Sequence, residues 1–278
     1  MIISIASIKV QLVFSREFKP VLQDIKDRFS SYILDDHQEE TIVFKLHVTP
    51  SKHRAVAMHN RKNYSFYAAR NYWVIIHNTS RCTLSWESGW AILQFWGEHD
   101  RLFFALQDYL KFIFACQTIL RGGLPLHCSA VASAGRALVF FGPSGIGKTT
   151  IATLFTPEWT LLNDEFNIVL PDNTMRYRVY STPFTKLDNL PLCSNGAGEV
   201  VGLFALRQSA SNRVSSLTLQ QAMFMLSSSC YTIPTTVVFG ERMLETMHNL
   251  YGQPGVRQLS FINTKTVVQD MHLFLKGD

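Results

Sequence analysis

The clearest chemical pattern in the chain is a glycine-rich segment near its middle. A glycine, four residues and then Gly-Lys-Thr is the spacing of a phosphate-binding loop. Its glycines let the backbone fold closely around phosphate oxygens, so that successive N–H groups point inward. Its lysine would reach the β- and γ-phosphates of ATP, and its threonine hydroxyl would ligate Mg²⁺. The residues predicted to bind the nucleotide are Gly142, Pro143, Ser144, Gly145, Ile146, Gly147, Lys148, Thr149 and Thr150.

A second group of candidate residues is a pair of adjacent carboxylates after an apolar run, Leu161-Leu162-Asn163-Asp164-Glu165. Two neighbouring carboxylates are rarely buried unless a cation balances their charge. In phosphoryl transfer one carboxylate fixes the metal, and another accepts the proton of an incoming hydroxyl. The stretch therefore predicts a partner for the magnesium shell, with an exposed acidic turn as the alternative.

His127 lies between apolar neighbours in a predicted strand that precedes the loop. A single histidine in such a place is usually a core residue whose polar atoms are satisfied. In a functional role, it would orient Asp164 or contact the hydroxyl of a substrate.

Residues that would bind the substrate accepting the phosphoryl group follow no comparable motif. Thr182-Pro183-Phe184 would shape an acceptor site, or form a turn packed on the core. The basic segment 51–63 is either a solvated loop or an arm that contacts an acidic substrate. The cations that would stabilise charge on the transferred phosphoryl group, or else are surface charges, are Arg178, Lys186, Arg207 and Arg213.

Hydrophobic periodicity predicts the elements that position these residues. An apolar run at 137–141 predicts a buried strand that leads into the loop, and 150–155 predicts the helix that follows it. Further strands are predicted at 8–14, 41–48, 64–68, 72–77, 82–86, 90–96, 126–132, 159–163, 168–170, 175–179, 199–206 and 256–261. Further helices are predicted at 19–34, 100–120, 219–227, 237–251 and 265–275. A junction at 117–123 separates a β-rich domain, 1–120, from a phosphate-loop domain, 121–278.

Composition limits the classes of protein that fit. Of 278 residues, 47% are hydrophobic and 17% are charged, which provides a sizeable core and excludes global disorder. The net charge of +5 includes no dense basic tract, so we expect no nucleic-acid partner. Five scattered cysteines without metal-site spacing are typical of a reduced, cytoplasmic protein. No uncharged apolar run is long enough to span a bilayer, so we expect no membrane partner.

The order of three motifs resembles the catalytic core of bacterial HPr kinase/phosphorylase. These are Leu126-His127, the loop Gly142 to Thr149, and Asn163-Asp164-Glu165. The closer likeness is to the HPr-kinase-related enzymes of lasso peptide gene clusters, which phosphorylate the C-terminal serine of a precursor peptide. Stretches 180–184, 203–206 and 212–214 also resemble that subgroup, and the likeness covers about residues 119–278.

The resemblance implies a role for several residues. Lys148 and Thr149 take the phosphate and magnesium roles, and Asp164 takes the role of general base toward the serine hydroxyl. His127 matches the family histidine that supports this base. Glu165 stands where HPr kinase has a second aspartate, and it is a further candidate ligand of magnesium. Cys128 replaces a family glycine, a departure that argues against HPr itself as the substrate.

Together these features predict an α/β protein. Its core would be a P-loop kinase of HPr kinase C-terminal type, with a mixed sheet and flanking helices, after a smaller β-rich α+β domain. The expected reaction moves the γ-phosphate of ATP, with Mg²⁺, onto a serine of a precursor peptide or small protein acceptor. The alternatives are an HPr-type protein kinase, a kinase of a small metabolite, and a nucleotide-dependent switch or ATPase without a phosphoacceptor. A homo-oligomer is compatible with each.

Overall fold

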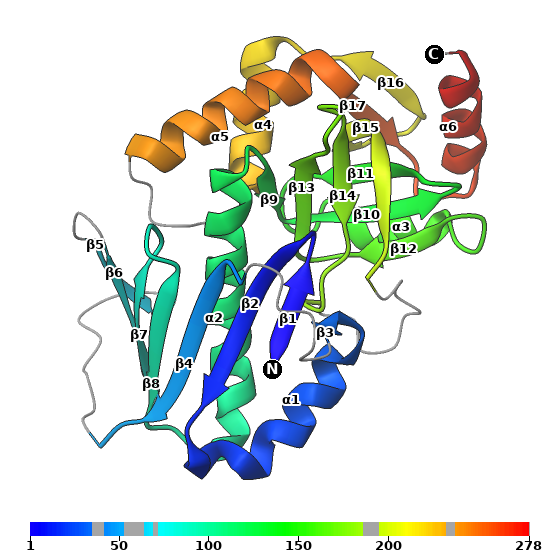
Figure 1. Ribbon diagram of the computed structural model, residues 1–278. Helices are drawn as coiled ribbons and strands as arrows, with labels where there is room; N and C mark the ends of the chain where they lie inside the picture. Colours follow the sequence, from blue (N-terminus) through cyan, green and yellow to red (C-terminus); the bar gives the residue numbers. More distant parts are fainter. Residues whose placement is uncertain (35–41, 53–63, 69–71, 186–194, 232–236, 278) are drawn as a thin grey trace. The chain divides into compact units, whose positions relative to one another are not determined.

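The computed structural model describes residues 1–34, 42–52, 64–68, 72–185, 195–231 and 237–277 (Figure 1). Its contacts divide the chain into two compact units, Met1–Gln117 and Thr118–Asp278. The sequence placed the junction three residues later, after residue 120. Both units are mixed α/β structures, each built on its own mixed sheet.

The first unit is built on an eight-stranded sheet of order β3-β1-β2-β4-β8-β7-β6-β5. Strands β2, β4 and β8 run parallel to one another, and the other neighbouring pairs are antiparallel. The strands are β1 (Ile2–Ile5), β2 (Ile8–Phe14), β3 (Ile33–Leu34), β4 (Phe44–Pro50), β5 (Tyr64–Ala68), β6 (Trp73–His77), β7 (Ser80–Ser85) and β8 (Trp90–Phe95).

Helix α2 (His99–Leu120) contacts this sheet and matches the predicted helix at 100–120. The hydroxyls of its Tyr109 and of Ser80 lie 3.0 Å apart, and the Phe112 ring lies 5.4 Å from that of Phe66. The predicted helix at 19–34 is wrong at both ends. A 3₁₀ turn that contains Pro20 precedes α1 (Leu22–Phe29), and Ile33 pairs with β1 instead of continuing the helix.

The second unit is built on a nine-stranded mixed sheet. Its main path has the order β12-β10-β11-β15-β14-β13-β9, and β17 joins it by pairing with β15 and β16. Strands β11, β15 and β17 are parallel neighbours, so their carboxyl ends lie at one edge. The strands are β9 (Leu124–Leu126), β10 (Cys128–Ser133), β11 (Arg136–Phe141), β12 (Thr160–Asn163), β13 (Asn167–Pro171), β14 (Tyr177–Tyr180), β15 (Ala197–Gln208), β16 (Arg213–Ser216) and β17 (Val256–Phe261).

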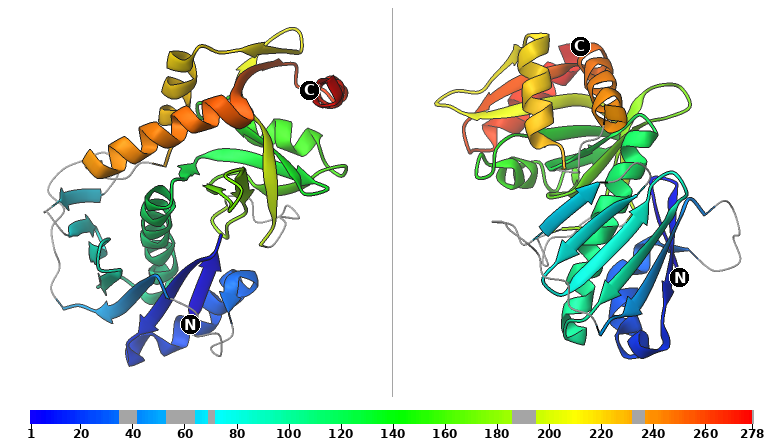
Figure 2. Two further views of the ribbon diagram at one scale, coloured as in Figure 1. Left: turned by 45° about the horizontal axis from the view of Figure 1, so that its top comes forward. Right: turned by 90° about the vertical axis from the view of Figure 1, so that its left-hand side faces the viewer.

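Helices cover both faces of this sheet, which explains the uninterrupted apolar run in β11. Leu138 and Phe140 pack in one core cluster with α3 (Lys148–Leu154) and α6 (Thr266–Gly277). Val139 and Phe141 pack in the other, with α4 (Leu219–Ser229) and α5 (Val237–Leu250). Figure 2 shows α4 and α5 side by side, with α6 apart from them.

The structure corrects the prediction at one important point. The strand predicted at 126–132 begins at Cys128 as β10, which pairs with β11 and β12, whereas Leu126 is the last residue of a separate strand, β9, which pairs with β13. His127 lies at the break between β9 and β10. Strands β1, β3, β9 and β16 were not predicted. In the described part of the chain, no helix has both the length and the apolar character needed to cross a bilayer.

Candidate active site

The phosphate-binding loop lies between β11 and α3, as the sequence predicted. Three of its residues have positive φ angles: 144° at Gly142, 80° at Gly145 and 106° at Gly147. Side chains of L-residues rarely adopt such backbone angles, so glycine is required there. Gly147 also precedes the first residue of α3, and the amide of Ile151 donates to its carbonyl at 2.9 Å. The loop therefore ends on the first turn of a helix, which is an arrangement suited to anions.

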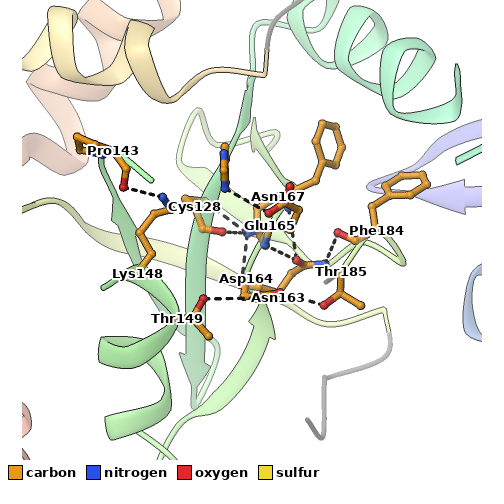
Figure 3. Close-up of polar contacts among 12 residues, drawn as sticks. Cys128, Pro143, Lys148, Thr149, Asn163, Asp164, Glu165, Asn167, Phe184 and Thr185 are labelled. Atoms are coloured by element: carbon orange, nitrogen blue, oxygen red, sulfur yellow. Dashed lines mark hydrogen bonds and ion pairs between the residues drawn. The ribbon is translucent and has the colours of Figure 1, made fainter. Parts of the chain in front are cut away.

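The side chain of Lys148 points back toward the start of the loop (Figure 3). Its Nζ donates to the carbonyl oxygen of Gly142 at 2.9 Å and to that of Pro143 at 3.1 Å. The side chain is 7% exposed, so the loop's own carbonyls solvate much of an otherwise costly buried charge. The ammonium is thereby held within the curve of the loop.

Asp164 lies directly after β12 and is 6% exposed. Each of its carboxylate oxygens accepts a hydrogen bond from a threonine hydroxyl (Figure 3). Thr149 donates to Oδ2 at 3.3 Å, and Thr185 donates to Oδ1 at 2.9 Å. The structure thus brings the end of β12 to the first turn of α3, as the magnesium hypothesis requires.

His127 pairs with Glu165 and not, as we expected, with Asp164. Its Nε2 lies 3.2 Å from Oε2 of Glu165, and the two side chains are 38% and 19% exposed. The break between β9 and β10 frees His127 from the ladder, and its amide donates to the carbonyl of Ser229 at 2.8 Å. The histidine is therefore not a buried core residue, and its partner is the second carboxylate.

These groups share one cavity of about 260 Å³, which we call the phosphate-loop cavity. It combines an ammonium, two carboxylates, an imidazole, hydroxyls and glycine backbone. The residues that line it are His127, Ser144, Gly145, Gly147, Lys148, Thr149, Thr150, Asp164 and Glu165. Most of the predicted catalytic and nucleotide-binding residues therefore meet at a single place.

Asn163 fixes the turn that carries the two carboxylates, and it is fully buried. Its Nδ2 donates to the carbonyl of Thr182 at 2.7 Å, and its Oδ1 accepts from the amide of Glu165 at 2.8 Å. Sequence reasoning gave no role to Asn163 or Thr185, although both bond to the turn that carries the two carboxylates. No spacing pattern links Thr185 to Asp164, because the contact joins residues 21 positions apart.

Of the predicted acceptor-side residues Thr182, Pro183 and Phe184, the first and the last are buried in the protein core. Thr182 and Phe184 are 2% and 1% exposed, and the Phe184 ring packs edge-on against Phe166 at 5.6 Å. The hydroxyl of Thr182 donates to the carbonyl of Phe166. Among the described residues that line the phosphate-loop cavity, none of the three appears. Thr182 and Phe184 instead accept hydrogen bonds from the side-chain amide of Asn163, as in the alternative of a turn packed on the core.

Of the predicted cations, the three arginines are absent from the described residues that line the phosphate-loop cavity. Arg178 lies in β14, opposite Leu170 and Glu199. Arg213 begins β16 and lines a separate cavity of about 300 Å³ beside α6. Arg207 is exposed in β15. Lys186 and most of the basic segment 51–63 lie outside the described residues.

Thr149 and Asp164 fit a Mg²⁺ ion that is bound together with the phosphates of a nucleotide. Within the described ranges, no group of three or more His, Cys, Asp or Glu residues forms a metal site of its own. Mg²⁺ usually keeps several waters and binds one or two carboxylates together with substrate phosphates. The hydroxyl of Thr149 and the carboxylate of Asp164 provide protein oxygens of that kind, 3.3 Å apart.

Comparison with known proteins gives a family and two short local matches. The model of the family described as SynChlorMet cassette protein ScmC matches residues 92–274, more than half of the chain. A phosphoenolpyruvate carboxykinase (ATP) of Afipia carboxidovorans is 47% identical over 58 residues, which are 20% of this chain and 10% of that protein. One of Rhodopseudomonas palustris is 52% identical over 46 residues, 16% of this chain and 8% of that protein. The chain thus spans about a tenth or less of the curated relatives it matches.

Proposed function

The chain belongs to the family of SynChlorMet cassette protein ScmC, and we propose that it is an ATP- and Mg²⁺-dependent kinase. Its proposed acceptor is the serine hydroxyl of a peptide, with the C-terminal serine of a lasso-type precursor as the specific case. The family description names a cassette and no activity, so the proposal depends on the site.

One observation carries the proposal. Thr149 of the loop and Asp164 of β12 share a hydrogen bond, and Lys148, His127 and Glu165 line the same cavity. Binding of phosphates alone requires only the backbone N–H groups of the loop. The added pair of carboxylates, one of them with an imidazole partner, supports group transfer as well as binding.

The phosphate-binding role belongs to the loop and its lysine. Backbone N–H groups at 142–149 and the Nζ of Lys148 would hold the β- and γ-phosphates. The hydroxyl of Thr149 and the carboxylate of Asp164 would hold Mg²⁺. When bound, the ion supplies positive charge that offsets the charge developing on the phosphate oxygens. Both matched enzymes are named phosphoenolpyruvate carboxykinase (ATP), which agrees with this nucleotide.

The contacts favour a different proton acceptor from the one expected from the sequence. Asp164 is engaged by Thr149 on the metal side, and a carboxylate that binds a cation is a weaker base. Glu165 is the other carboxylate of the cavity, and it has the imidazole of His127 at 3.2 Å. In the proposed step the serine oxygen bonds to the γ-phosphorus as the bond to the β,γ-bridging oxygen breaks. The serine proton passes to Glu165, and His127 holds that carboxylate in place.

A peptide acceptor is supported by the likeness to lasso peptide kinases, which rests on the segments 180–184, 203–206 and 212–214 in addition to the three motifs shared with HPr kinase. The second candidate, a switch or ATPase without an acceptor, would use the same Glu165–His127 pair to activate water, so the presence of a phosphorylated acceptor is what separates it from the kinase. An HPr-type protein kinase uses the same reaction and differs in the acceptor alone.

The test is mass spectrometry of peptides incubated with the protein, ATP and Mg²⁺. We expect one phosphate on a peptide that ends in serine, and none on the matched peptide that ends in alanine. Lys148→Ala and Asp164→Asn should each abolish transfer and leave the circular dichroism spectrum unchanged. ATP hydrolysis that is indifferent to every peptide, without a phosphopeptide, would reject the kinase proposal in favour of the switch.

A further inference from the structure

A second cavity, of about 390 Å³, adjoins the phosphate-binding loop, and none of the roles above uses it. We call it the strand-end cavity. The residues that line it are Gly145, Gly147, Thr150, Gln208, Ser209, Phe261, Ile262 and Asn263.

The topology of the sheet creates this cavity. Strands β11, β15 and β17 are parallel neighbours, and the loop, Gln208–Ser209 and Ile262–Asn263 lie at or just beyond their carboxyl ends. Crevices outside the carboxyl ends of parallel strands are where open α/β sheets bind ligands. The position therefore favours a ligand site over an accidental surface hollow.

The two cavities meet at the loop. Gly145, Gly147 and Thr150 line both of them. The carboxylates and His127 lie on the side of β12 and β10, whereas the strand-end cavity lies on the side of β15 and β17. A ligand gripped by the loop can thus extend from one cavity into the other.

The lining of the strand-end cavity differs in chemistry from that of the phosphate-loop cavity. In the described part of the chain it has no charged side chain. Phe261 gives an aromatic wall, and its ring would lie 3.1 Å from a Cβ added at Gly147. Gln208, Ser209 and Asn263 give amide and hydroxyl groups, and the Nε2 of Gln208 donates to the carbonyl of Ile146 at 3.3 Å. Such a lining suits a neutral, flat, polar group and not further phosphates.

We propose that the strand-end cavity binds the nucleoside half of the nucleotide, its base and ribose, and thereby orients the γ-phosphate toward Asp164 and Glu165. This inference rests on the proposed function, and it adds the direction in which the nucleotide lies across the loop. The acceptor peptide then enters from the opposite side, where the carboxylates are.

The experiment compares the binding of MgATP with that of magnesium tripolyphosphate, which lacks the nucleoside, by isothermal titration calorimetry. The variants Asn263→Trp and Ser209→Trp fill the cavity from two exposed positions. Leu273→Trp, at the separate cavity beside α6, is the matched control. We expect the two filling variants to raise the Kd for MgATP by at least about tenfold and the Kd for tripolyphosphate by less than about twofold. The control should change neither.

The outcomes separate this inference from the proposed function. If the wild type binds MgATP and the filling variants bind it equally well, the strand-end assignment is wrong and the kinase proposal stands. The strand-end assignment is also wrong if these variants raise the KM for the acceptor peptide and leave the Kd for MgATP unchanged. If the wild type binds neither MgATP nor tripolyphosphate, both proposals are wrong.

Discussion

The hydroxyl of Thr149 donates a hydrogen bond to Oδ2 of Asp164 over 3.3 Å, although the residues are 15 positions apart in the chain. Thr185 donates to the other oxygen of the same carboxylate at 2.9 Å. One carboxylate is thus held by two hydroxyls, one from the phosphate-binding loop side and one from the segment after β14. This arrangement allows the two hydroxyls to be tested against each other.

Removing these hydroxyls should have unequal effects. Thr149→Val removes a proposed ligand of Mg²⁺, and we expect kcat/KM to fall by at least about a hundredfold. Thr185→Val removes only a group that orients Asp164, and we expect the Mg²⁺ needed for half-maximal activity to rise about tenfold. Titration of activity with Mg²⁺ measures both. If Thr149→Val and Thr185→Val changed kcat/KM and the Mg²⁺ requirement to the same extent, the assignment of Thr149 to the metal would be wrong.

The pair of His127 and Glu165 should act as one unit. Glu165→Gln should lower kcat by about two to four orders of magnitude, with the Kd for MgATP unchanged, because proton acceptance is needed only in transfer. His127→Asn should lower it less. Residues that act together are strongly non-additive, so the double variant should be about as slow as Glu165→Gln alone. Additive losses in this double-mutant cycle, measured by peptide phosphorylation, would show that the two residues act separately.

Gly147 should tolerate no side chain. Its φ of 106° is unfavourable for alanine, and the new Cβ would lie 3.1 Å from the Phe261 ring. We expect Gly147→Ala to cost about 1–3 kcal/mol, seen as a lower melting temperature and weaker MgATP binding. Gly252→Ala is the control, since its Cβ would meet nothing within 4 Å. The strain argument fails if both variants behave alike.

Asn163 should contribute to stability as well as to the site. Asn163→Ala would leave the carbonyl of Thr182 and the amide of Glu165 without their present bonds. Each buried polar group left unsatisfied costs about 1–3 kcal/mol, so the urea midpoint should fall clearly. The exposed Asn173 is the matched site for comparison, where alanine should change the free energy of unfolding by less than about 0.5 kcal/mol. An unchanged midpoint for Asn163→Ala would contradict the proposed role.

The thiol of Cys128, which is fully buried, should be unreactive. Burial raises the pKa of Cys128 from 9.0 to about 12. At pH 8 the thiolate fraction is then on the order of 1 in 10,000, so iodoacetamide should label this residue far more slowly in the native chain than in urea. Mass spectrometry of the labelled peptides measures this, and equal rates would contradict it.

The same shift has a consequence for stability. Between pH 9 and 12 the unfolded chain loses the thiol proton of Cys128, which the folded chain retains. The free energy of unfolding should therefore fall as the pH rises through this window. Urea titrations at pH 8 and pH 10 test the direction.

Short-range patterns in the sequence predicted much of the second unit correctly. The strand before the loop, the helix after it and the two strands that form the β13–β14 hairpin were all expected from apolar runs. Each of these elements is specified by residues close together in the chain, so a stretch of about ten residues is enough to predict it. The helix at 19–34 was misjudged, because Ile33 continues an apolar spacing yet gains more by pairing with Ile3.

The candidate site shows the same division. The sequence by itself determined that a loop with the spacing of phosphate-binding loops, two adjacent carboxylates and a histidine are present, because glycine conformation and side-chain chemistry are local properties. Only the tertiary structure decided that Thr185 bonds to Asp164, that His127 pairs with Glu165, and that the ends of β15 and β17 form a cavity beside the loop. Those relations follow from strand order and register, which are set by packing between segments far apart in the chain and leave no mark in the spacing of residues.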